Sequence, residues 1–422
     1  MPSDDPWRGK ASAVEFDLTP SLGVPLAGER VPRRASQVDG SLCCSALLLE
    51  DDAHRLVIVS CDLLYPGQHL VGVLERLRGE GLMDSFGVFA SHSHNAPATD
   101  PTKPELGGID RGYLDEILGR VESSIRGLCT GRTVEVSMTA GSQPSHLGVN
   151  RRLYRPIVVT RRGVQIRTVV SGANPKGPLD ERVSVVVLRD AADDSPIAVV
   201  WSYACHPVGY PHRANVTPHY VGVVRDRLRS LFGNLDLPIL FLQGFSGDTR
   251  PNHATTNAAK NRGWRRLLMG PSYSSFSPEG YEQWTEELAG QVGRLALTRS
   301  DPVLGEGIEI QTHTMPRTDF LLGSPGRSPV AFKSFRFGRD LRIVGVSAEV
   351  VSEYAHWVRS FVHERQVIPA GCMDDVVGYV PTEKMLREGG YEGGGFCESF
   401  SARAVAPGVE SAVKRGFRAV CS

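Results

Sequence analysis

The chain has 422 residues, and 47 basic side chains balance 47 acidic ones, so the formal net charge is zero. This balance excludes the global basic field of a general nucleic-acid-binding protein and the acidic bias of a disordered chain. Hydrophobic residues make up 41% of the sequence, which is usual for a globular protein that buries its core without disulfide bonds.

Strand and helix patterns alternate along the chain. The predicted strands lie at residues 55–60, 86–90, 197–203, 238–242 and 341–346. The predicted helices lie at residues 68–78, 112–128, 220–232, 281–298 and 350–365. This alternation predicts an α/β fold in which helices flank a mixed central sheet. Residues 133–188 show strand patterns alone and predict antiparallel β-structure.

No composition shift marks a domain linker, so we expect one domain over residues 1–422. Residues 252–277 are rich in Gly, Ser and Arg and predict an insert that is either a lid over a substrate or a surface loop with an oligomer contact. Homo-oligomer formation therefore stays open.

The sequence carries no membrane or secretion signal. No run approaches the ~18 apolar residues of a spanning helix, and the polar, acidic start lacks the pattern of a signal peptide. We therefore expect no integral membrane segment and a cytoplasmic location. The eight cysteines form no C-x-x-C pair, so we expect reduced thiols and no zinc ribbon.

Each predicted strand is followed by a side chain that can bind a metal or move a proton. These residues are Asp62, His92 with His94, His206, Asp248 and Glu349. In open α/β sheets, ligands bind outside the carboxyl ends of the strands. The repeated pattern therefore predicts a site at one edge of the sheet.

Two histidines and one glutamate among these residues match a hydrolytic zinc site. His92 and His94 are two residues apart, so both side chains of an extended segment point the same way. Either both face one cavity, or one binds while the other supports it; one of them with His206 and Glu349 makes the His₂-carboxylate set of catalytic zinc. The alternatives are a pair of surface histidines, a core role for His206 and a helix-capping role for Glu349. No H-E-x-x-H motif occurs, and Asp248 interrupts a G-x-S-x-G elbow.

Eight short motifs follow one another between about residues 14 and 396. They are FDLTPSLGVP (16–25), DL (62–63), SHSHNAP (91–97), NRR (150–152), CHP (205–207), GDTRPN (247–252), GYVPT (378–382) and YEGG (391–394). Together they resemble the N-terminal amidase domain of the neutral ceramidases and its shorter bacterial relatives.

The resemblance implies a set of site residues. The family's zinc ligands fall on His92, His206, Glu349 and Tyr379. Positions that line its reaction centre fall on His94, Arg151 and Tyr391, and the Asp of its G-D motif falls on Asp248. The chain departs from the family in carrying Arg250 where the family has a serine, which excludes a serine nucleophile at that position. We also expect neither the secretion signal nor the C-terminal immunoglobulin-like domain of the classical family members.

These features predict a zinc-dependent amidohydrolase that attacks its substrate with metal-activated water. Tyr391, His94 or Arg151 is expected to donate hydrogen bonds to the oxyanion, and Asp248 either accepts a proton or orients a histidine. Arginines in the insert favour a small polar or anionic substrate over ceramide. The alternatives are a true ceramidase, a metal-dependent lyase or transferase, and a non-catalytic binding protein on the same fold.

Overall fold

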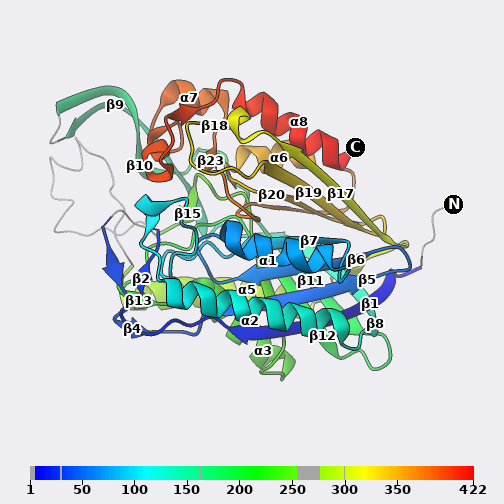
Figure 1. Cartoon of the computed structure of the whole chain (residues 1–422). Helices are drawn as coiled ribbons and strands as arrows, with labels where there is room; N and C mark the ends of the chain where they lie inside the picture. The colour runs from blue at the N-terminus through cyan, green and yellow to red at the C-terminus, as the bar shows by residue number, and fades with distance from the viewer. Residues whose placement is uncertain (1–4, 29–30, 161–162, 254–275, 299) are drawn as a thin grey trace.

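Two β-sheets pack face to face at the centre of the molecule, and helices cover their outer faces (Figure 1). The computed structural model describes residues 5–28, 31–160, 163–253, 276–298 and 300–422. The predicted insert, residues 252–277, lies outside this description except at its two ends. The prediction of a single domain stays a prediction.

The larger sheet has nine strands in the described part of the chain, with the order β14-β12-β11-β8-β1-β5-β6-β7 and β16 beside β8. The strands are β1 (Arg8–Asp17), β5 (Cys43–Glu50), β6 (Arg55–Cys61), β7 (Ser85–Ala90), β8 (Val134–Pro144), β11 (Arg182–Asp190), β12 (Pro196–Tyr203), β14 (Ile239–Gln243) and β16 (Asp301–Pro302). β6 pairs with β7 and β12 with β14 in parallel, and the other pairs are antiparallel. The predicted mixed sheet is confirmed.

The second sheet has the order β17-β19-β20-β22. Its strands are β17 (Ile308–Met315), β19 (Val330–Phe337), β20 (Leu341–Val346) and β22 (Gln366–Ala370). Apolar side chains from the inner faces of both sheets form one cluster, in which Leu47 and Ile58 of the larger sheet join Phe335 and Ile343 of the smaller. Because both faces of β6 are buried, its sequence is a continuous apolar run rather than an alternating one.

Helices α1 (Gly67–Gly79), α2 (Arg111–Thr130), α3 (Tyr220–Phe232) and α5 (Pro278–Leu297) cover the outer face of the larger sheet, as predicted. Helices α6 (Glu353–Arg359) and α8 (Val409–Cys421) pack on the smaller sheet, and a short α7 (Glu383–Glu388) lies near its end (Figure 1). The helix predicted over residues 350–365 is shorter than expected. It begins later because Glu349 and Val350 pair as a strand.

Small strand pairs and turns complete the structure. β9 (Gly148–Thr160), β10 (Gly163–Asn174) and β15 (Thr249–Pro251) form an antiparallel sheet whose β9–β10 hairpin projects from the body (Figure 1). Two-residue strands are β2 (Pro25–Leu26), β3 (Arg33–Arg34), β4 (Gln37–Val38), β13 (Asn215–Val216), β18 (Leu321–Leu322), β21 (Glu349–Val350), β23 (Tyr379–Val380) and β24 (Ala404–Val405). Three 3₁₀ turns lie at Pro104–Leu106, Arg317–Asp319 and Gly395–Phe400.

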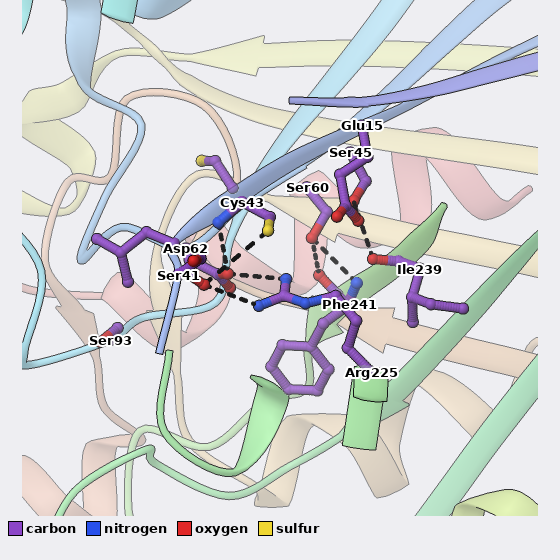
Figure 2. Close-up of polar contacts among 12 residues, drawn as sticks. Glu15, Ser41, Cys43, Ser45, Ser60, Asp62, Ser93, Arg225, Ile239 and Phe241 are labelled. Atoms are coloured by element: carbon purple, nitrogen blue, oxygen red, sulfur yellow. Dashed lines mark hydrogen bonds and ion pairs between the residues drawn. The ribbon is translucent and has the colours of Figure 1, made fainter. Parts of the chain in front are cut away.

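The larger sheet curls until its edge strand β14 crosses the inner face of β5 and β6. Ser60 Oγ of β6 donates to the Phe241 carbonyl at 2.7 Å and lies 3.0 Å from the Phe241 amide nitrogen. Ser45 Oγ of β5, opposite Ser60 in the register, lies 3.1 Å from the Ile239 carbonyl (Figure 2). Ile239 and Phe241, alternate residues of β14, thus contact β5 and β6, respectively, so β14 runs across these two strands. The two serine hydroxyls contact backbone groups on the edge of β14 that has no strand partner among the described residues.

We predict that Ser60→Ala lowers the free energy of unfolding by about 1–3 kcal/mol, because it leaves the buried N–H and C=O of Phe241 without their partner. Urea denaturation measures the change. The control is Ser123→Ala, whose hydroxyl bonds to an exposed carbonyl on α2 and whose loss is expected to cost no more than about 0.5 kcal/mol. Equal losses in the two variants would contradict the closing role of Ser60.

Candidate metal centre

Short segments after the strands position the candidate ligands. His92 and His94 follow β7, and His206 follows β12. Glu349 and Tyr379 are register partners in the parallel pair β21–β23, which places their side chains next to each other. The His92 backbone has φ = 65°, a left-handed conformation that is costly for a residue with a Cβ and that typically occurs at functional sites.

Backbone carbonyls fix the tautomer of all three imidazoles. The three Nδ1 atoms lie 3.1 Å (His92), 3.1 Å (His94) and 2.7 Å (His206) from the carbonyls of Leu64, Gly28 and Ser246, respectively. Because a carbonyl only accepts hydrogen bonds, Nδ1 carries the proton in each neutral ring. Each Nε2 is therefore left with a lone pair.

These Nε2 atoms converge with an oxygen of Glu349. The Glu349 Oε2 atom lies 3.3 Å from Nε2 of both His92 and His206. The Nε2 atoms of His92 and His94 lie 3.4 Å apart, and the Tyr379 hydroxyl lies 3.2 Å from Nε2 of His206. The structure thus brings together all four predicted ligands and His94.

The converging atoms are suited to a cation. Glu349 is 3% exposed, and its Oε2 has no hydrogen-bond partner among the described residues. Ligand atoms of His92, His94 and His206 all lie within 4.8 Å of one another. Lone pairs and a carboxylate that face each other without a donor repel, and a zinc ion bound by imidazole and carboxylate relieves that repulsion.

The electrostatics of the cluster agree with this geometry. Burial by itself would raise the pKa of Glu349, but His92 and His206 outweigh it and hold that pKa well below its usual range. Burial opposes protonation of His92, yet the Glu349 carboxylate raises the His92 pKa well above its usual value. Burial and the nearby Arg151 charge lower the pKa of His206 to about 4. The Glu349 carboxylate therefore favours positive charge at this position.

Arg151 lies beside this cluster and is held by its own network. Its Nη2 donates to the Tyr379 hydroxyl at 3.1 Å and to the Gly247 carbonyl at 2.9 Å, and its Nε donates to Glu392 at 2.6 Å. The guanidinium carbon lies 5.7 Å from the ring centres of both Tyr379 and Tyr391. Tyr391 is 42% exposed and so stands at the rim of the site.

The adjacent Arg151 and Arg152 are neutralised by glutamates of the YEGG segment and the residues before it. Glu392 accepts from Arg151 with one oxygen and from Arg152 at 2.9 Å with the other. Arg152 also pairs with Glu388 at 3.4 Å. Glu392 belongs to the YEGG motif, and its contacts show that it fixes the orientation of Arg151.

Asp248 is completely buried, and its carboxylate joins two segments of the site. Its oxygens accept from Asn150 Nδ2 and from the Ser352 backbone N–H, each at 2.8 Å. Burial raises the Asp248 pKa to about 6. These bonds connect the segment that carries Arg151 with the one that carries Glu349.

Asp62, which also follows a strand, takes part in a different interaction. Its Oδ2 accepts from Arg225 Nη1 of α3 at 2.8 Å and from the Cys43 amide at 2.9 Å, and Arg225 reaches the Ser41 carbonyl (Figure 2). Both members of this ion pair are buried. Asp62 therefore attaches α3 to the sheet.

Sequence reasoning missed one buried residue that touches the cluster. The hydroxyl of Tyr65 donates to Oε1 of Glu349. Tyr65 lies in the segment after β6, three residues beyond Asp62. This position after a strand is the one sequence signal that could have identified it. Cys372, whose backbone φ is 51°, is also buried beside the cluster, and the Cys372 carbonyl accepts from the Ala90 amide at the end of β7.

The comparisons with known proteins bear on the fold. No protein-family model matches the sequence, and no curated protein matches it. The neutral ceramidase from Pseudomonas aeruginosa superposes with a TM-score of 0.75 at 16% identity, over 98% of this chain and 74% of the other. A ceramidase described as complexed with C2 superposes with a TM-score of 0.73 at 16% identity, over 99% of this chain and 76% of the other.

The chain has the neutral ceramidase fold. This confirms, at the level of the fold, the resemblance drawn from the motifs. No helix in the described part of the chain combines the length and hydropathy needed to cross a bilayer.

We predict that Asp62→Ala lowers the free energy of unfolding by about 3–5 kcal/mol, because it leaves the Arg225 charge buried without its partner. The matched control is Glu75→Ala, which breaks an exposed pair with Arg78 and is expected to cost at most about 1 kcal/mol. Chemical denaturation of both variants measures the difference. A loss for Asp62→Ala as small as that of the control would refute the attachment of α3 by this pair.

Proposed function

We propose that this chain is a zinc-dependent hydrolase that cleaves an amide bond of a small polar or anionic molecule. The observation that carries the proposal is the convergence of the His92 and His206 lone pairs on the buried, unpartnered Oε2 of Glu349. His92, His206, Glu349 and Tyr379 would hold the ion. When bound, zinc supplies a Lewis acid that polarises a carbonyl group and lowers the pKa of water toward about 7.

Arg151 binds and orients the substrate in this proposal. Its Nε and Nη2 are engaged by Glu392, Gly247 and Tyr379, which fixes the plane of the guanidinium. The side chain is 13% exposed, and Nη1 is the nitrogen left to donate to a substrate carbonyl or carboxylate. The Tyr391 hydroxyl at the rim donates to the same group.

His94 serves as the proton acceptor. Its Nδ1 proton is held by the Gly28 carbonyl, so Nε2 presents a lone pair on the side of His92. Burial and the neighbouring His92 and His206 lower the pKa of His94 well below its usual value, which keeps the ring neutral near pH 7. A neutral ring takes up a proton at Nε2 and passes it to the departing amine.

Asp248 positions the site rather than contacting the substrate. Both of its oxygens are occupied by Asn150 and Ser352. Its hydrogen bonds hold the Arg151 and Glu349 segments at a fixed distance, in the way that residues hydrogen-bonded behind metal ligands orient those ligands.

A ceramide-type lipid amide is the second candidate substrate. The shared fold favours it, because the two structures reported above are described as ceramidases. The partly exposed Arg151 guanidinium beside the candidate metal centre favours a polar substrate instead, because an acyl chain gains little from a charged neighbour.

We predict about one zinc ion per chain by elemental analysis after gentle purification. His206→Ala and Glu349→Ala are each expected to lose the zinc and the hydrolytic activity together, because each removes one converging acceptor. The control is His146→Ala, an exposed histidine paired with Glu181, which keeps the zinc. Purified wild-type protein free of metal and unable to take up zinc would refute the proposal.

We also predict that Arg151→Met lowers kcat/KM for N-acyl amino acids about 10²–10³-fold while zinc content stays at the wild-type level. The assay compares N-acyl amino acids with a short-chain ceramide. The Arg250→Ala variant is expected to remain active, because metal chemistry does not need the serine that this position holds in the ceramidase family. Faster hydrolysis of the ceramide, unaffected by Arg151→Met, would favour the second candidate.

A further inference from the structure

The segment after β6 holds two of the candidate ligands through adjacent residues. The Leu64 carbonyl accepts from Nδ1 of His92 at 3.1 Å, and the hydroxyl of the next residue, Tyr65, donates to Oε1 of Glu349. Backbone bonds from Ser91 to Cys61 and from Ser93 to Leu63 fix this segment alongside the His92 loop. The pair Leu64–Tyr65 therefore sets the position of both an imidazole and a carboxylate.

The Tyr65 hydroxyl distinguishes the two oxygens of Glu349. Oε1 receives its hydrogen bond, whereas Oε2 faces Nε2 of His92 and of His206 at 3.3 Å and has no partner among the described residues. A carboxylate without such a donor turns about its last side-chain torsion, which is broad and two-fold, and presents either oxygen or both.

The Tyr65 side chain is itself held firmly. It is 4% exposed, and its ring packs against those of His92 and Phe400, with centres 5.3 and 6.1 Å away. Lys103 Nζ lies 5.5 Å from the ring centre, and Thr99 Oγ1 donates to the Tyr65 carbonyl at 2.8 Å. A phenol hydroxyl carries its proton near pH 7, and a carboxylate oxygen only accepts, so Tyr65 is the donor in this hydrogen bond.

We propose that Tyr65 is a positioning residue that reserves Oε1 of Glu349 and leaves Oε2 as the single carboxylate oxygen facing the metal centre. This inference rests on the proposed zinc function. It assigns a purpose to a residue that lies outside the motifs of the sequence analysis. Restricting Glu349 to one oxygen keeps room at the centre for water and for the substrate carbonyl, since catalytic zinc keeps an open position.

The test is Tyr65→Phe, which removes the hydroxyl and keeps the ring packing on His92 and Phe400. We expect the zinc affinity of the full-length protein, measured by competition with a chelating dye, to fall about 10–100-fold. With Co²⁺ in place of zinc, we expect weaker visible absorption, because a freed carboxylate that contributes both oxygens raises the coordination number. Near-UV circular dichroism confirms that the variant is folded.

The matched control is Tyr113→Phe, which removes another buried tyrosine hydroxyl, one that donates to the Leu18 carbonyl at 2.7 Å. It is expected to cost stability without changing zinc affinity or the Co²⁺ spectrum. If Tyr65→Phe binds zinc with the wild-type affinity and gives the wild-type Co²⁺ spectrum, this inference is overturned and the proposed function is not. A wild-type protein that binds neither zinc nor Co²⁺ overturns the proposed function, and the inference with it.

Discussion

The crossing of β14 over β5 and β6 is the constraint on which the site depends. In the pairing order of the larger sheet, β6 and β7 run opposite to β12 and β14, so a flat sheet would place their carboxyl ends at opposite edges. The curl of the sheet carries the end of β12 and β14 over that of β7, and His206 thereby reaches His92. The Ser60 hydroxyl stabilises this crossing by pairing with both backbone groups of Phe241 on the buried edge of β14, and Ser45 contacts the Ile239 carbonyl.

Around that crossing, buried charges are balanced in separate groups. Asp62 pairs with Arg225 of α3, and the buried Glu392 pairs with both Arg151 and Arg152. Among the described residues, the Glu349 carboxylate has no arginine or lysine paired with it, and its Oε2 faces Nε2 of His92 and of His206 without a hydrogen-bond partner. Buried ionic groups are tolerated when each is paired. The unpaired group therefore indicates where a ligand of positive charge belongs.

Local sequence patterns predicted much of the fold and part of the site. Strands 55–60 and 341–346 and the helix over 220–232 were found because apolar runs and helical periodicity are local properties. The candidate ligands His92, His206 and Glu349 followed from residue type and strand-end position, whereas the candidate ligand Tyr379 followed only from the family resemblance. Tyr65 was missed because one tyrosine after a strand carries no periodic or motif signal. Asp62 has the same strand-end signature as the ligands and serves an ion pair.

The sequence by itself determined the alternation of strands and helices, the acceptor side chains at the strand ends and the absence of a serine at position 250. These features depend only on residue type and on short-range spacing along the chain. Only the tertiary structure decided which strand ends meet, which tautomer each histidine adopts and which oxygen of Glu349 faces the centre. Those choices depend on a curled sheet and on backbone carbonyls of residues such as Gly28 and Ser246, whose positions no local pattern encodes.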